Sequence, residues 1–133
     1  MKFSTVQPSD DEMRVMLEIG FILREAGKFD DAEAVFRGAS EFIPNSDVPR
    51  VGLGTVKFQR GDFEAALAEY EDVLQRRPDS VYARVHRAET LLFQHNREEA
   101  ETELHDIIEK NPASPHSRTA QALLDIADMI SPE

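Results

Sequence analysis

The sequence predicts an all-α fold made of three stacked helical hairpins and a closing C-terminal helix. Two unrelated residue types recur at one interval of 34 residues. The prolines are Pro44, Pro78 and Pro112, and the alanines are Ala32, Ala66 and Ala100. A constant interval of this length is typical of helical hairpins that stack on one another.

Length and composition narrow the classes of protein. The chain has 133 residues, which suits one domain, and it carries a formal net charge of −11. That charge disfavours binding to nucleic acid, because the basic residues are dispersed. The chain contains no cysteine, no long apolar run and no apolar signal region after Met1. We therefore expect a cytoplasmic protein that neither binds nucleic acid nor inserts into a membrane.

The first hairpin follows a short lead-in. Residues 1–8 are irregular and are expected to be flexible, and residues 9–133 are expected to form one domain. Ser9 and Glu12 form a capping-box pattern at the start of a helix that runs to about residue 26. A second helix is predicted over residues 30–43.

The remaining helices follow from the same pattern of caps and stops. The second hairpin is predicted to have one helix ending at residue 60 and another over 63–77, and the third has helices over 81–94 and 97–109. Ser114 and Pro115 then open a closing helix over 115–130. A closing helix covers the last open face of a stack.

Small residues recur where two helices of a hairpin must approach closely. Gly20 and Ala32 supply them in the first hairpin, and residues of similar size stand 34 and 68 positions later. Phe36 and Tyr70 are expected to fill the space between neighbouring hairpins, and Leu104 fills it less bulkily. No hairpin has enough core to be stable alone, so stability is expected to come from contacts between neighbours.

This combination of residues resembles the tetratricopeptide repeat. The pattern of Ile19-Gly20, Gly27, Ala32, Phe36, Ala39 and Pro44 is repeated at 53–78 and 87–112. The resemblance implies a right-handed superhelix with repeats at about 13–46, 47–80 and 81–114. The third repeat departs from the pattern, since Arg87 replaces a leucine and His95 replaces the turn glycine.

The resemblance also implies a binding groove, because the first helix of each hairpin lines the concave side in that family. Arg14, Arg24 and Val48 belong to this face, and aromatic Phe21, Phe58 and Tyr82 are the expected anchors. The predicted groove residues are Leu17, Phe21, Val51, Thr55, Phe58, Tyr82, Val85, Glu89 and Leu92. The alternative is that these side chains pack against the next hairpin or the N-terminal segment.

The groove residues suggest an apolar partner. Lys and Asn residues that would clamp an acidic tail are absent from the corresponding positions, so an amphipathic helix or an extended apolar peptide is expected. Size, acidity and the segments 51–54 and 86–89 are similar to small bacterial type III secretion chaperones built from these repeats. A scaffold or adaptor subunit of a larger assembly is the alternative function, and a homodimer is left open.

No residue constellation predicts an enzyme, a cofactor site or a metal site. The four histidines are His86, His95, His105 and His116, and none stands at metal-ligand spacing from residues that the repeat would bring together. His105 and Glu101 are four residues apart, but Glu101 belongs to a run of acids typical of a solvated helix face.

Overall fold

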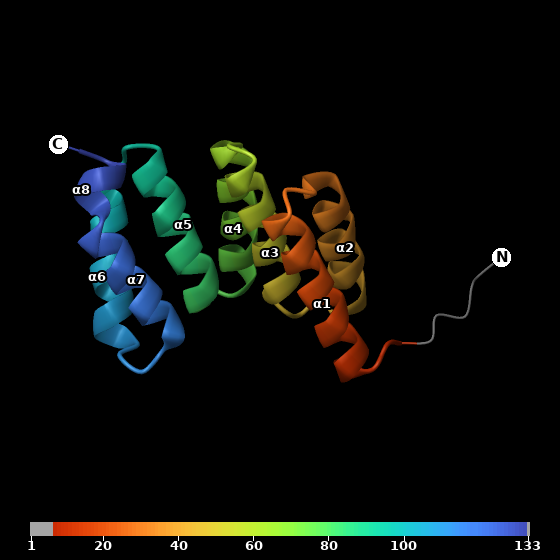
Figure 1. The fold of residues 1–133 in the computed structure, drawn as a ribbon. Coiled ribbons are helices and arrows are strands. Elements are labelled where there is room, and N and C mark those ends of the chain that lie inside the picture. The colour runs from red at the N-terminus through yellow and green to blue at the C-terminus, as the bar shows by residue number, and fades with distance from the viewer. Residues whose placement is uncertain (1–6, 133) are drawn as a thin grey trace.

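The computed structural model describes residues 7–132, and these residues form eight helices and no strand. The helices are α1 (Asp10–Glu25), α2 (Phe29–Phe42), α3 (Val48–Gln59), α4 (Phe63–Arg76), α5 (Val81–Phe93), α6 (Arg97–Lys110), α7 (Pro115–Asp125) and α8 (Ala127–Ile130). The hairpins α1–α2, α3–α4 and α5–α6 stand side by side, and α7 and α8 close the stack (Figure 1). The all-α prediction is confirmed. Residues 1–6 of the predicted lead-in lie outside the described residues.

The helix ends follow the predicted signals. Ser9 accepts a hydrogen bond from the backbone of Glu12 at 3.1 Å, and the Glu12 side chain accepts one from the Ser9 backbone at 3.2 Å, which completes the capping box. Ser80 caps α5 through the backbone N–H of Ala83. Asp47 does not cap α3, and its carboxylate instead accepts a hydrogen bond from the Ser80 hydroxyl at 2.6 Å. This bond joins the loops before α3 and α5.

The turn inside each hairpin uses a left-handed residue. Gly27 and Gly61 have φ angles of 75° and 88°, which glycine adopts without steric cost. His95 takes the same place in the third hairpin with a φ of 64°. The replacement of the turn glycine by His95 therefore preserves the turn geometry. It costs some backbone strain, because a residue with a side chain adopts this conformation less readily than glycine.

A ring held between two glycines joins the first hairpin to the second. Phe36 of α2 is completely buried, and a Cβ atom added at Gly20 or Gly52 would lie 2.8 or 2.7 Å from its ring. The phenyl ring thus contacts α1 of its own hairpin and α3 of the next. Tyr70 of α4 packs in the same way against Gly54.

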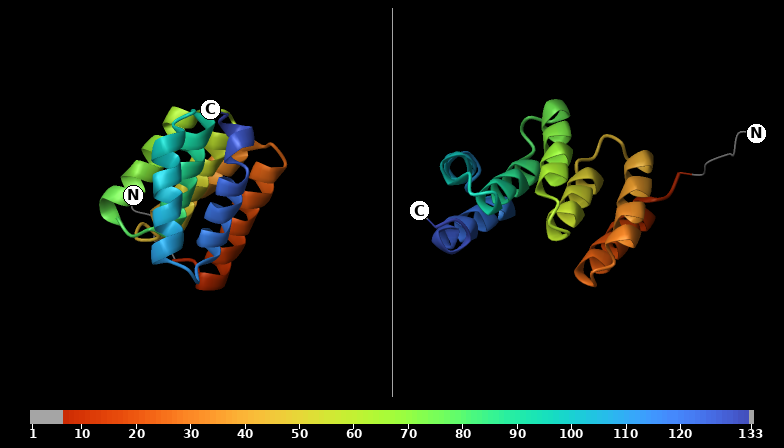
Figure 2. Two further views of the ribbon diagram at one scale, coloured as in Figure 1. Left: turned by 90° about the vertical axis from the view of Figure 1, so that its left-hand side faces the viewer. Right: turned by 90° about the horizontal axis from the view of Figure 1, so that it is seen from above.

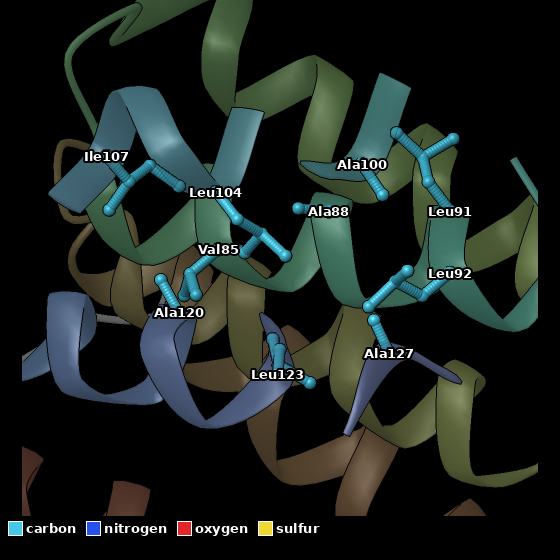
Figure 3. Packing of buried hydrophobic residues seen from close by; sticks show 10 residues of the cluster. All are labelled: Val85, Ala88, Leu91, Leu92, Ala100, Leu104, Ile107, Ala120, Leu123 and Ala127. Carbon is cyan, nitrogen blue, oxygen red and sulfur yellow. The ribbon is translucent and has the colours of Figure 1, made fainter. Parts of the chain in front are cut away.

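The third interface is built from smaller groups. Leu104 of α6 lies in one buried cluster with Ala88 of α5 and Ala120 of α7, and Figure 3 shows these side chains meeting between the three helices. Ala88 and Ala120 stand where the first interface uses Gly20 and Gly52, and Leu104 stands where Phe36 and Tyr70 stand in the first two interfaces. The interface is closed by α7, as predicted.

The closing segment differs from the prediction in one respect. The helix expected over 115–130 is interrupted at Ile126, whose φ of −109° and ψ of 10° leave the helical conformation. After this break, Ala127 packs beside Leu92 of α5 (Figure 3). Arg97 of α6 donates a hydrogen bond to the carbonyl of Ser131 at 3.0 Å, so Ser131 is held against the third hairpin.

We predict that Gly54→Ala destabilises the protein by about 1–3 kcal/mol, because the new methyl group would overlap the buried Tyr70 ring. Gly38→Ala is the matched control, since its Cβ would meet only the flexible end of Met16 at 3.1 Å. That control should be neutral or stabilising by up to about 1 kcal/mol, as expected for alanine in a helix. Urea unfolding of both variants measures the difference, and equal losses would contradict the packing described.

Candidate functional site

The first helices of the hairpins form one continuous layer. α1 contacts α3, α3 contacts α5 and α5 contacts α7, whereas the second helices of neighbouring hairpins make at most marginal contact within the described residues. The hairpins follow one another along a curved stack (Figure 2). Because the more closely spaced layer of a curved stack lies on its inner side, α1, α3, α5 and α7 provide the inner face.

The structure divides the nine predicted groove residues into two groups. Partly exposed are Leu17, Phe21, Phe58, Tyr82 and Glu89, and buried are Val51, Thr55, Val85 and Leu92. The buried group cannot contact a partner in this conformation. For these four residues the alternative considered from the sequence, packing against the chain's own helices, describes the structure.

The buried residues are covered by helices that follow them in the chain. Val85 and Leu92 pack in a cluster with Leu123 and other residues of the closing segment. Val51 packs with Tyr70 and Ala83 of the following helices. These predicted groove residues of α3 and α5 therefore face the helices that follow them in the stack and do not face the open inner side.

One end of the inner face is apolar and is anchored by Arg24. Leu17 and Phe21 pack on the first core cluster, and the Phe21 ring meets Phe36 edge-on at a centroid distance of 5.0 Å. The Arg24 guanidinium lies 5.1 Å from the centre of the Phe21 ring and donates a hydrogen bond to the Thr55 hydroxyl at 2.8 Å. Arg24 thus fixes α1 to α3 and holds the Phe21 ring in place.

The other end carries a row of four rings that crosses three helices. His86 of α5 stacks on Tyr70 of α4 at 6.1 Å and meets Tyr82 edge-on at 5.1 Å. Tyr82 in turn stacks on His116 of α7 at 5.1 Å. The His86 imidazole also lies 3.2 Å from the Glu89 carboxylate. His116 was not among the predicted site residues, although it stands 34 positions after Tyr82.

Burial disfavours the charged form of three rings in this row. It raises the pKa of the Tyr70 and Tyr82 hydroxyls, whose neutral form is also the ordinary one at physiological pH. Burial also lowers the pKa of His116, and the neighbouring His86 lowers it further. The Tyr70 hydroxyl is buried without a hydrogen-bond partner among the described residues.

Three phenylalanines gather at the turn edge of the second and third hairpins. Phe58 contacts Phe93 at 5.0 Å and Phe63 at 5.3 Å between ring centroids. Phe93 remains 40% exposed. Phe58 is therefore held in an aromatic cluster rather than standing alone on the inner face, a contact that repeat spacing does not reveal.

Three features of the described residues concern metal-binding groups, helix-capping serines and membrane-spanning helices. Across residues 7–132, no group of three or more His, Asp or Glu side chains could hold a metal ion. Ser9, Ser80 and Ser114 are occupied as helix caps. In the same described part of the chain, no helix combines the length and apolar character needed to cross a bilayer.

Comparisons with known proteins agree with this architecture. A family described as tetratricopeptide repeat matches residues 57–124. No curated protein sequence matches the chain. The type III secretion translocator chaperone SycD of Yersinia enterocolitica has a similar structure, with a TM-score of 0.75 and 23% identity over 88% of this chain and 90% of that one.

A second similar structure is PcrH from Pseudomonas aeruginosa, with a TM-score of 0.73 and 24% identity over 90% of this chain and 94% of that one. PcrH in complex with the chaperone binding region of PopB is also similar, with a TM-score of 0.73 and 23% identity over 92% and 99% of the two chains. At these identities the likeness concerns the fold.

We predict that the pKa of His116 lies below its ordinary value of 6.5, because burial and the nearby His86 disfavour the charged form of the imidazole. The unfolded chain then binds a proton that the folded chain resists, so the free energy of unfolding should fall as pH drops through 6.5. NMR titration of the imidazole measures the midpoint. His86→Gln should raise that midpoint, and a midpoint at or above 6.5 in the unaltered protein would refute the assignment.

Proposed function

This chain belongs to the tetratricopeptide repeat family, and from that membership we propose that it binds an apolar or amphipathic segment of a partner protein on its inner face. The observation that carries the proposal is the partial exposure of Leu17, Phe21, Phe58 and Tyr82 on the inner layer. The buried side chains of Phe36, Tyr70 and Leu104 already fill the interfaces between hairpins. These four side chains pack on the core clusters on one side and keep apolar surface exposed on the other, which is typical of a binding surface.

The inner face suits a guest with apolar residues at two places. Leu17 and Phe21 would take one apolar side chain, and Tyr82 with the flat His116 ring would take another. Arg24 of α1 and Glu89 of α5 lie beside these two apolar places and can bond polar groups on the guest. An amphipathic helix or an extended segment presents apolar groups at such intervals.

More specifically, we propose that the protein is a chaperone for an apolar secreted partner in the cytoplasm. The overall likeness to SycD and PcrH supports this assignment, and PcrH is known in complex with the chaperone binding region of PopB. The net charge of −11 would keep such a complex soluble while an apolar surface is displayed. The proposed role is binding, without an enzymatic step.

The proposal is tested by recovering the partner. The tagged protein is purified from its native cell and co-purifying proteins are identified by mass spectrometry. Each candidate is then expressed with and without this chain. A chaperone keeps a partner soluble that aggregates alone, whereas a partner that is equally soluble alone would indicate a scaffold and overturn the chaperone assignment.

We predict that Phe21→Gln weakens binding of the recovered partner at least about tenfold, because it removes a partly buried aromatic anchor. Ile22→Gln is the matched control, since Ile22 is the next residue and points away from the inner face with 65% exposure. Phe58→Glu should weaken the same complex. Calorimetric titration measures affinity and circular dichroism checks folding, and equal binding by both α1 variants would place the partner elsewhere.

A further inference from the structure

Helix α1 carries a second apolar surface on the side that faces away from α3, at the start of the stack. Val15, Ile19 and Ile22 are 51%, 45% and 65% exposed. Their spacing places them in one stripe along the helix, about 140–200° around the axis from Leu17. Beside the stripe, Met16 of α1 and Val35 of α2 complete a shallow hollow of about 450 Å³. We call Val15, Ile19 and Ile22 the outer stripe.

The equivalent residues in the next two repeats show what packs on these positions. Moving 34 residues along the chain turns the outer stripe into Pro49, Leu53 and Val56, all of which are buried. Leu53 and Val56 pack with Ala32 and Phe36 of the preceding hairpin. In the next repeat Ala83, which corresponds to Val15, packs with Ala66, Tyr70 and Val73 of α4. These positions receive the second helix of the hairpin before, and no described helix covers the outer stripe.

The occupant differs from the hairpin that packs on α3. The Phe36 ring docks on Gly52 of α3, and the residue that corresponds to Gly52 on α1 is Glu18. Glu18 is exposed and has a side chain where Gly52 leaves room for the ring. A helix can lie along the outer stripe, but no ring can dock against the α1 backbone there as Phe36 docks on Gly52.

Charge indicates the chemistry of that helix. The residues three or four positions from the outer stripe include the exposed acids Asp11, Glu12, Glu18 and Glu25. Asp11 is paired with Arg14, and Glu25 with Arg24, which is bonded to the inner side at Thr55. Two more carboxylates than guanidiniums therefore border the stripe. A second copy in a twofold pairing of α1 helices would bring these carboxylates together.

We propose that the outer stripe docks an amphipathic helix of a different protein, in which aliphatic residues at helical spacing are flanked by Lys or Arg. Burial of Val15, Ile19 and Ile22 supplies the affinity, and the acidic border selects a basic partner over an acidic one or a second copy. This site is separate from the inner face, so the two partners can bind together.

The probes are two synthetic 18-residue helices with leucine at positions i, i+4, i+7 and i+11. One has lysine beside the leucines and the other has glutamate. Fluorescence anisotropy measures their binding to the full chain. The lysine helix should bind, and the double variant Ile19→Gln/Ile22→Gln should weaken binding at least about tenfold.

Two matched variants separate this site from other surfaces. Met129→Gln removes an 82% exposed apolar side chain of α8, the helix at the far end of the stack (Figure 1), and Phe21→Gln alters the inner face. Both should bind the lysine helix as the unaltered protein does. Circular dichroism establishes that each variant is folded.

Three results would overturn the proposal. The first is equal binding of the lysine helix by the double variant, which would reduce the interaction to general attraction by an acidic protein. The second is equal binding of the glutamate helix. The third is a dimer of the unaltered protein, seen by analytical ultracentrifugation, that dissociates in the double variant, because the occupant would then be a second copy.

Discussion

The close approach of helices around Phe36 is the constraint on which the rest of the structure depends. The ring lies against Gly20 on one side and Gly52 on the other, and neither position has room for a methyl group. Since this packing sets how near α1 and α3 lie, it also allows Arg24 to reach Thr55 and to steady Phe21. The spacing of α1 and α3 on the inner face is therefore set by the buried packing of Phe36, which is not itself part of the inner face.

The 34-residue interval was sufficient to predict the hairpins, because prolines, small residues and caps act through local backbone chemistry. The ends of the first six helices agree with the prediction to within one residue. The interruption at Ile126 was not predicted, since residues 115–130 contain no glycine and no proline after Pro115. The interruption accompanies two tertiary contacts, of Ala127 with Leu92 and of Ser131 with Arg97. Leu92 and Arg97 lie far from Ile126 in sequence, so the local pattern does not reveal these contacts.

The candidate site was predicted less completely, because a repeat pattern tells which side of a helix a residue occupies but not which element covers it. Val85 and Leu92 lie on the expected side, yet α7 and α8 pack over them. His116 has the repeat position of Tyr82, but only the packing of α7 on α5 brings the two rings into a stack. Contacts between neighbouring units thus decide which positions remain available.

The three interfaces between hairpins also differ in a way that concerns assembly of the chain. A phenyl ring lies between two glycines, a phenol between a glycine and His86, and Leu104 between two alanines. Repeat proteins are prone to pairing a unit with the wrong neighbour while they fold. In this chain, a hairpin placed beside the wrong neighbour would bring Phe36, Tyr70 or Leu104 against a surface with too little or too much space for that side chain. The sizes of the side chains at each interface therefore favour the native order of the hairpins.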